Sequence, residues 1–83
     1  MDEELKELVI EMAQGNPGAV SVLVQLAQQP GGALDILELK RQDCRGPLIW
    51  IRYKDVCGED IAALRANIRV TADEHEATAP PSA

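Results

Sequence analysis

Prolines and glycines fall at regular places in this sequence and cut it into short segments. The breaks are Gly15 to Pro17, Pro30 to Gly32, Gly46 to Pro47, and Gly58. Proline cannot supply the N–H group that a helix interior needs, and glycine favours the turns that end helices, so these positions mark element boundaries. The sequence therefore predicts short elements that are joined by tight turns.

The first two segments have the residue spacing of helices. Between residues 2 and 14, apolar side chains recur every three or four residues among acidic ones, which is typical of an amphipathic helix that ends at Gly15. Asn16 suits the N-cap of a second helix, and Pro17 suits its first position, where a missing N–H costs nothing. We expect this second helix to extend to about Gln29. It carries apolar residues on more than one side, so we expect it to be central; they are Val20, Val22, Leu23, Val24, Leu26 and Ala27.

Two further helices are predicted around residues 33–43 and after Gly58. The third carries Leu34, Ile36, Leu37 and Leu39 among charged residues. In the fifth, Glu59 and Asp60 serve the start, and Ile61, Leu64 and Ile68 form one apolar face that ends near Val70.

The run Leu48 to Tyr53 is ambiguous, because it is rich in residues that favour strands and is too short to be assigned by periodicity. The flanking residues favour a helix, since Pro47 suits a first helical position and Gly58 suits a position just past an end. No second strand-like run is present to pair with a lone strand. A fourth helix over about 47–57 is preferred.

The composition changes after residue 70. Residues 71–83 consist largely of Ala, Thr, Glu, Pro and Ser without a large apolar side chain, so we expect a disordered, acidic tail. The 83 residues suffice for one domain, which is assigned to 1–70. The predicted fold is an all-α, compact bundle of about five short helices with a disordered C-terminal tail.

The charge is unevenly distributed. Eight Lys and Arg against fourteen Asp and Glu give a net charge of −6, which opposes general nucleic-acid binding. The first helix is acidic, whereas residues 40–69 hold seven cations and four acids, a net charge of +3. A small anion could therefore be accommodated locally.

No catalytic or metal-binding constellation is visible. The single histidine, His75, lies in the predicted tail, and Cys44 and Cys57 lack the spacing of a zinc site. We therefore expect neither an enzyme nor a cofactor or metal. The first residues are acidic, no apolar run is long enough to span a membrane, and cysteines are few. We therefore expect a cytoplasmic protein that does not associate with a membrane.

Two places could hold a ligand. A glycine-flanked helix start offers unpaired backbone N–H groups to an anion, which selects Asn16, Gly18 and Ala19, although most such starts are plain caps. Trp50 and Tyr53 lie three residues apart, with cations beside them, so a second candidate is a stacking platform formed by Arg52, Tyr53 and Lys54. The alternative is that the aromatic pair fills the core or, with Ile49 and Trp50, an interface between subunits.

Two segments together, Gly15-Asn16-Pro17-Gly18-Ala19 and Ile49-Trp50 followed by Tyr53-Lys54-Asp55 and Cys57-Gly58-Glu59-Asp60, resemble a family of small, mostly uncharacterised helical proteins encoded by phages and prophages. The similarity covers roughly residues 5–68, and it carries no catalytic assignment. It implies a compact, homo-oligomeric protein of the host cytoplasm, in a setting where small non-enzymatic proteins often counter host defences.

Three functions remain open on this basis. The first is an anti-defence sponge that sequesters a nucleotide-derived signalling molecule, with phosphate at the start of the second helix and stacking at Tyr53. The second is an inhibitor of a host defence protein, or a structural adaptor, that acts through the apolar surface around Leu48 to Val56. The third, DNA mimicry by the acidic first helix, is weaker because no comparable acidic run occurs elsewhere in the predicted domain.

Overall fold

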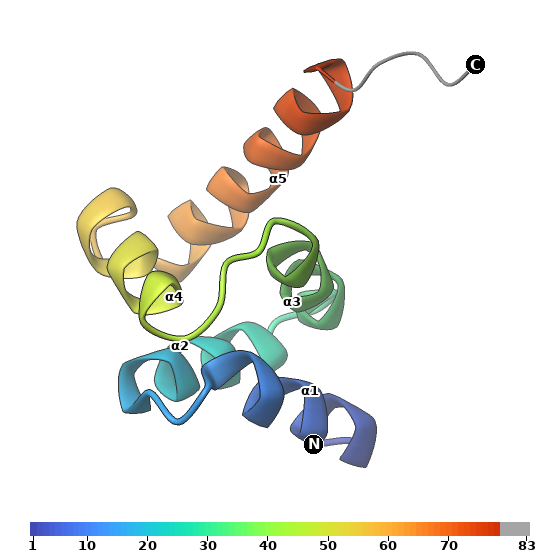
Figure 1. Cartoon of the computed structure of the whole chain (residues 1–83), viewed down its shortest axis with the longest axis vertical. Helices are drawn as coiled ribbons and strands as arrows, with labels where there is room; N and C mark the ends of the chain where they lie inside the picture. Colours follow the sequence, from blue (N-terminus) through green and yellow to red (C-terminus); the bar gives the residue numbers. More distant parts are fainter. Residues whose placement is uncertain (79–83) are drawn as a thin grey trace.

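The computed structural model describes residues 1–78, and this part of the chain contains helices and no strands (Figure 1). The helices are α1 (Glu3–Ala13), α2 (Pro17–Ala27), α3 (Gly32–Arg41), α4 (Pro47–Ile51) and α5 (Ile61–Thr78), and a π-helical segment, η1 (Arg52–Val56), continues α4 directly. The predicted all-α bundle is confirmed. None of the described helices is both long and apolar enough to cross a membrane.

Helix α2 occupies the centre, as its apolar residues predict. It contacts α1, α3, α4 and α5, and its inward side chains are completely buried. Those side chains are Ala19, Val22, Leu23 and Leu26, and they pack with Met12, Ile36, Leu39, Ile49, Leu64 and Ile68 from the surrounding helices. Apolar burial of this kind is the main force that holds such a small bundle together.

Side-chain caps fix the starts of α2 and α5. The Asn16 Oδ1 atom accepts a hydrogen bond of 2.9 Å from the backbone N–H of Ala19, and Asp60 Oδ1 accepts one of 2.9 Å from Ala62. These bonds satisfy N–H groups that have no partner within a helix. The helix starts predicted at Asn16 and Asp60 are confirmed.

The predicted fourth helix is present, but its second half is wider than an α-helix. In η1, the N–H of Cys57 donates to the carbonyl of Arg52 at 3.0 Å, a spacing of five residues. Successive side chains of this helical segment point in different directions, and Arg52 reaches α5 while the hydroxyl of Tyr53 reaches Gln25 on α2. The segment thereby links two helices on different sides of it.

The predicted end of the fifth helix near Val70 is wrong, because α5 continues to Thr78. Ala and Glu are strong helix formers, and a helix that is already nucleated by packed turns extends at little cost. The hydroxyl of Thr71 also accepts a hydrogen bond of 3.2 Å from Arg52. Residues 71–78 of the predicted disordered tail are therefore helical, and residues 79–83 lie outside the described part.

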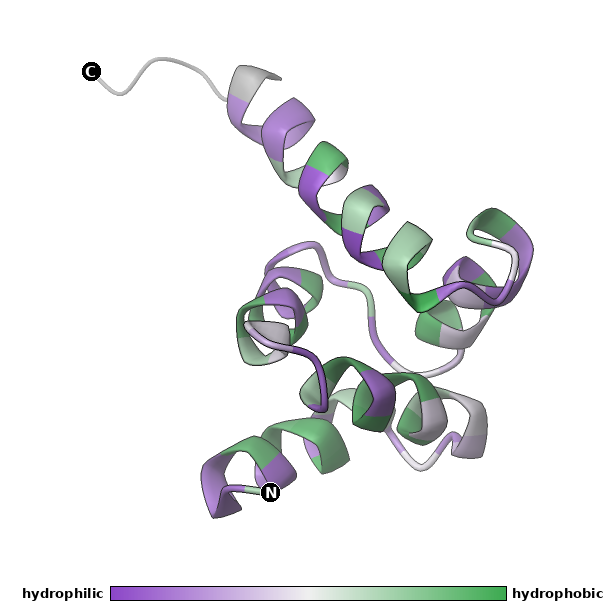
Figure 2. Ribbon diagram, turned by 180° about the vertical axis from the view of Figure 1, so that it is seen from behind, coloured by the Kyte–Doolittle hydropathy of each residue, from purple (hydrophilic) through white to green (hydrophobic). Residues whose placement is uncertain are grey.

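The C-terminal half of α5 extends beyond the other helices (Figure 1), and Figure 2 shows it as mainly hydrophilic. Its N-terminal half is fixed to α3 by a buried ion pair, in which Arg65 Nε lies 2.6 Å from Asp35 Oδ2. Arg65 also donates a hydrogen bond of 2.6 Å to the carbonyl of Pro30. The start of α3 and the middle of α5 are thus held together.

Candidate functional site

The predicted anion site at the start of α2 is largely occupied by the protein itself. The N–H of Ala19 already donates to Asn16, and the side chain of Ala19 is completely buried. Gly18 lies against the indole of Trp50, where a β-carbon at position 18 would be 2.7 Å from the ring atom Cδ2. The helix start and the aromatic segment are therefore adjacent, with Trp50 between them.

The two aromatic rings lie together but differ in exposure. Their centroids are 5.9 Å apart with an interplanar angle of 40°, as expected for a tilted aromatic pair. Tyr53 is 8% exposed, and its hydroxyl donates a hydrogen bond of 3.5 Å to Gln25 Oε1. Trp50 is half-buried, so it presents more of its ring to a ligand than Tyr53 does.

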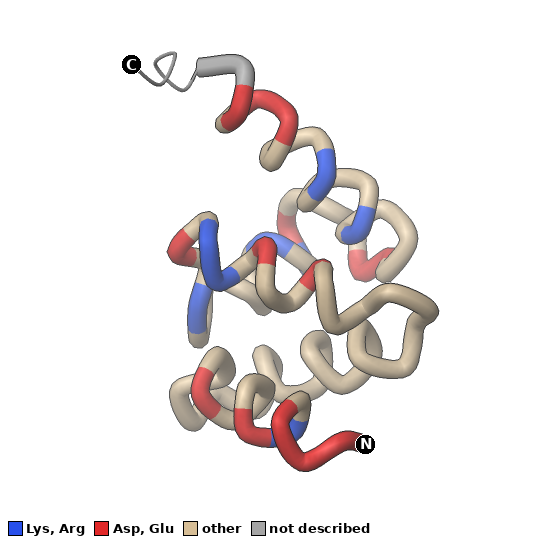
Figure 3. Tube along the Cα trace, turned by 90° about the vertical axis from the view of Figure 1, so that its right-hand side faces the viewer, with Lys and Arg blue, Asp and Glu red and all other residues tan. Residues whose placement is uncertain are grey.

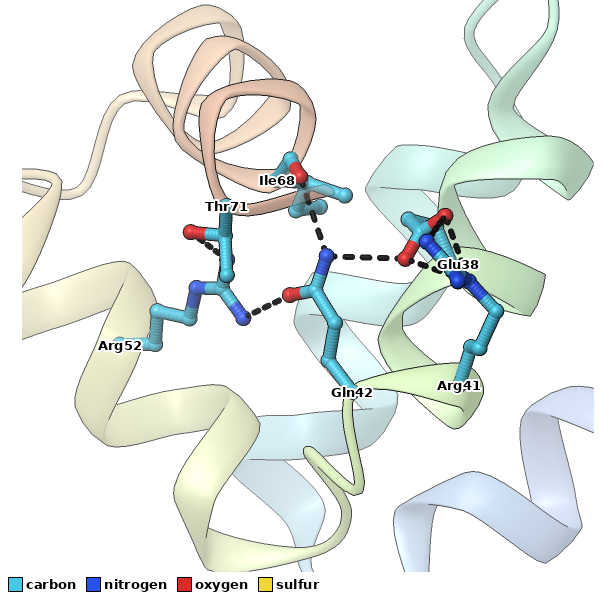
Figure 4. A network of polar contacts seen from close by, with 6 residues as sticks. All are labelled: Glu38, Arg41, Gln42, Arg52, Ile68 and Thr71. Carbon is cyan, nitrogen blue, oxygen red and sulfur yellow. Dashed lines mark hydrogen bonds and ion pairs between the residues drawn. The ribbon is translucent and has the colours of Figure 1, made fainter. Parts of the chain in front are cut away.

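Arg52 is engaged within the fold (Figure 4). Its guanidinium donates to Gln42 Oε1 at 2.8 Å and to Thr71 Oγ1 at 3.2 Å, both drawn in Figure 4. It also donates to Asn67 Oδ1 at 2.6 Å. A cation that already has three acceptors is a poor candidate for a phosphate contact. The structure assigns Arg52 to the packing of η1 against α5 and the end of α3.

Gln42 completes this polar network, which sequence reasoning did not find. Its amide nitrogen donates to Glu38 Oε2 at 3.0 Å and to the carbonyl of Ile68 at 3.1 Å (Figure 4). One amide thereby connects the last turn of α3, the π-helical segment and α5. Glu38 lies four residues before Gln42, a spacing at which helical side chains meet, so that contact could have been predicted. Ile68 and Arg52 lie 26 and 10 residues away, so local spacing could not reveal their contacts with Gln42.

The basic middle of the chain is mostly neutralised by acids of α1 and α3. The ion pairs are Lys40 to Glu11 at 3.4 Å, Arg41 to Glu38 at 3.0 Å, Arg45 to Glu11 at 3.7 Å and to Asp43 at 4.0 Å, Arg65 to Asp35 at 2.6 Å and Arg69 to Asp35 at 3.9 Å. Among the cations of residues 40–69, all of which are described, only Lys54 has no ion pair or hydrogen bond, and it is exposed. Figure 3 shows these cations interspersed with acids, whereas the α1 end is predominantly acidic. The local excess of +3 therefore does not produce a free basic surface.

The apolar residues of α4 and η1 divide between the core and the surface. Ile49, predicted at an interface, is 1% exposed and belongs to the core. The outward positions are instead Leu48, Ile51 and Val56, which are 56%, 48% and 64% exposed. Because all these residues are apolar, hydropathy could not distinguish inward from outward positions. Only Trp50 of the predicted interface pair is partly accessible.

The two cysteines are buried and are not joined in a disulfide bond. Burial raises the pKa of the Cys44 thiol, against a hydrogen bond donated by Arg52 that lowers it, and burial likewise raises the pKa of Cys57. A raised pKa keeps a thiol protonated and unreactive at neutral pH. Within residues 1–78, no three His, Cys, Asp or Glu side chains gather in a way that could hold a metal ion.

Two surface hollows lie away from the predicted ligand residues. One, of about 290 Å³, lies between α3 and α5 and contains more carboxylates than cations; it is lined by Gly31, Leu34, Asp35, Glu38, Ile68, Arg69, Ala72 and Asp73. The other, of about 310 Å³, lies between α1 and α3 and is lined by Asp2, Glu4, Leu5, Leu8, Ala33 and Leu37. Neither hollow has the charge that an anionic ligand requires.

The fold and these surfaces define a small all-α bundle with exposed apolar faces. No protein-family model matches the chain, and no curated protein or solved structure shows significant similarity to it.

Proposed function

We propose that this protein is a non-enzymatic, protein-binding helical module that acts as an inhibitor or structural adaptor. Its contact surface is the outer face of α4 and η1, defined by Leu48, Ile51 and Val56 and called here the outer α4 face. The exposure of these three side chains carries the proposal. Apolar residues gathered on one short segment of a small protein are typical of an interaction site.

The outer α4 face has the geometry of a helical contact. Leu48 and Ile51 lie three residues apart, so they share one side of α4. Full burial of an exposed Leu or Ile side chain contributes about 1.5–3 kcal/mol, so Leu48 and Ile51, which are 56% and 48% exposed, would each contribute roughly half of that. Trp50 on the same helix points elsewhere, since its ring lies against Gly18 of α2, so it is not counted in the outer α4 face.

The same face supports self-association. A patch that contacts its own copy about a twofold axis is the commonest arrangement in soluble oligomers, and small domains gain stability from it. In the phage setting that the sequence resemblance implies, the partner would be a host defence protein.

The test compares two substitutions at exposed apolar positions. Ile51→Asp places a charge on the outer α4 face, whereas Val70→Asp places one at a similarly exposed position on α5. We expect Ile51→Asp to abolish self-association in light scattering, or capture of a host partner from lysate, while Val70→Asp leaves both unchanged. Equal behaviour of the wild-type protein and Ile51→Asp in both measurements would refute the proposal.

Sequestration of a nucleotide second messenger is the second candidate. It is supported by the contact between Trp50 and Gly18, which puts an aromatic ring beside the start of α2, and by the exposed Lys54 four residues further on. In this arrangement Trp50 rather than Tyr53 is the stacking group. Two observations count against this function: the guanidinium of Arg52 and the N–H of Ala19 already make hydrogen bonds within the fold.

A thermal-shift panel of cyclic dinucleotides, cyclic trinucleotides and ADP-ribose derivatives tests this second function. A ligand at about 100 times its Kd stabilises the folded state by about 2.7 kcal/mol, which raises the Tm by several degrees. Lys54→Ala should reduce such a shift, whereas Lys6→Ala on the opposite, acidic part of the chain should not. The absence of any shift at saturating ligand would reject the sponge hypothesis.

A further inference from the structure

We infer that the groove between α1 and α3 is a docking site for a basic, amphipathic helix of a partner protein. The groove is lined by Leu5, Leu8, Ala33 and Leu37, with Asp2 and Glu4 at its edge, and is called here the acidic groove. It is distinct from the outer α4 face, and the inference does not depend on the function proposed for that face.

The floor of the acidic groove is apolar and incompletely covered. Leu5 and Leu8 are half-buried and pack against the core from one side only, and Leu37 is 48% exposed. Water that contacts these side chains would be released by an apolar surface laid over them. The groove therefore has room for the apolar stripe of a helix.

An ion pair defines one end of the groove. Glu11 lies one turn beyond Leu8 on α1, and Lys40 lies one turn beyond Leu37 on α3, and their side chains are 3.4 Å apart. The lining residues at this end of the chain run from Asp2 to Leu8, which at about 1.5 Å per residue is about 9 Å along a helix and close to two turns of a bound helix. A short amphipathic helix is the element that fits such a site.

The charge at the edge specifies the occupant. Asp2 and Glu4 line the edge, and Glu3 and Glu7 lie beside them on α1. These four acids are exposed and make no ion pair within residues 1–78, and Lys6 is the single cation on α1 (Figure 3). Charge of one sign beside an apolar groove attracts a ligand of the opposite sign and repels acidic ones. The chain's own cations between residues 40 and 69, except Lys54, are already engaged in ion pairs or, for Arg52, in hydrogen bonds within the fold, so a second copy offers little complementary charge. A separate basic protein fits better.

Two synthetic helices of about 18 residues provide the probes. Both carry Leu at positions i, i+3, i+4 and i+7, and the remaining positions are mainly Lys in one peptide and mainly Glu in the other. We expect fluorescence anisotropy to show that the Lys peptide binds and the Glu peptide does not, with binding that weakens as salt is added. NMR shifts should change at α1 and α3 rather than at α4.

Matched variants separate the acidic groove from general attraction to an acidic protein. Leu37→Ser removes an apolar contact inside the groove, and Leu34→Ser makes the same change at an exposed position of α3 that does not line it. Glu4→Lys reverses a charge at the edge, and Glu59→Lys reverses one on the loop before α5. We expect Leu37→Ser and Glu4→Lys each to weaken binding about tenfold, or about 1.4 kcal/mol, and the two controls to change it by less than about twofold.

Several results would overturn the inference. These are no binding of the Lys peptide, equal binding of both peptides, or equal effects of the groove variants and their controls. A decrease in the protein's own oligomer mass caused by Leu37→Ser would show that a second copy occupies the groove instead. Circular dichroism of each variant distinguishes these results from loss of the fold.

Discussion

The indole of Trp50 lies against Gly18 so closely that it occupies the space in which any other residue would place its β-carbon, 2.7 Å from ring atom Cδ2. This contact fixes the distance between α4 and the first turn of α2. A glycine in a helix is normally unfavourable, so its presence here reflects the approach of the ring rather than helix propensity.

Substitution of Gly18 by Ala should therefore destabilise the protein by about 1–3 kcal/mol, because an added methyl group in a tight contact forces the ring or the helix to move. Ser21→Ala, at an exposed position of the same helix, is the control and should have little effect. Urea denaturation measures the free energy of unfolding of both variants. In a Trp50→Leu background the penalty of Gly18→Ala should fall; the same penalty in both backgrounds would contradict this explanation.

Loss of the Arg52 side chain should also destabilise the fold. In Arg52→Met, the acceptors on Asn67, Gln42 and Thr71 lose a charged donor, and hydrogen bonds to charged groups contribute about 1.5–3 kcal/mol. Lys54→Met, two residues away at an exposed position, should leave the free energy of unfolding nearly unchanged. If Arg52→Met proved as stable as the wild-type protein, the network of Figure 4 would not contribute to stability.

Stability should decrease in acid partly through Glu38. Its hydrogen bond from Arg41 holds the pKa of Glu38 below the ordinary value of 4.5, against the opposing effect of burial. The folded state thus binds this proton less readily than the unfolded state, so the stabilisation is complete above pH 4.5 and is lost as the pH falls through the lower, folded-state pKa. Urea denaturation as a function of pH should show a smaller decrease for Glu38→Gln; a curve parallel to that of the wild-type protein would exclude the contribution.

Both thiols should react slowly in the native protein. Burial raises the pKa of Cys44 and Cys57, and each side chain is less than a tenth exposed. Alkylation at neutral pH, followed by mass spectrometry, should be much faster in urea than in buffer. Rapid native alkylation of Cys57 would show that the end of η1 opens readily, and rapid alkylation of Cys44 would show the same for the connection between α3 and α4.

Local sequence signals predicted the elements that depend on local chemistry. Asn16 and Asp60 cap helices by bonds within three residues, so their roles could be inferred from spacing. The π-helical turn at Arg52 could not, because it is linked to contacts with Asn67 and Gln25 from distant parts of the chain. The extension of α5 past Val70 is not predicted, because residues 71–78 carry no large apolar side chain and such a composition is also typical of disorder.

The candidate site was only partly predictable for the same reason. The start of α2 lies beside the aromatic segment because Gly18 contacts Trp50. These residues are far apart in the sequence, so no local pattern predicts the contact. Ile49 and Ile51 are chemically identical, yet one is in the core and the other is 48% exposed. The sequence also shows seven cations in the middle of the chain, but it does not show which carboxylates lie beside them in the fold and neutralise most of them.

The projection of α5 beyond the bundle has a practical consequence for attachment chemistry. Asp2 borders the acidic groove, so a tag or fluorophore fused ahead of Met1 would lie where a bound helix is expected and would compete with it. The last turns of α5 extend away from the other helices. A label introduced at exposed Glu76, by a cysteine in a background that lacks the two native thiols, would therefore report on binding without obstructing either the acidic groove or the outer α4 face.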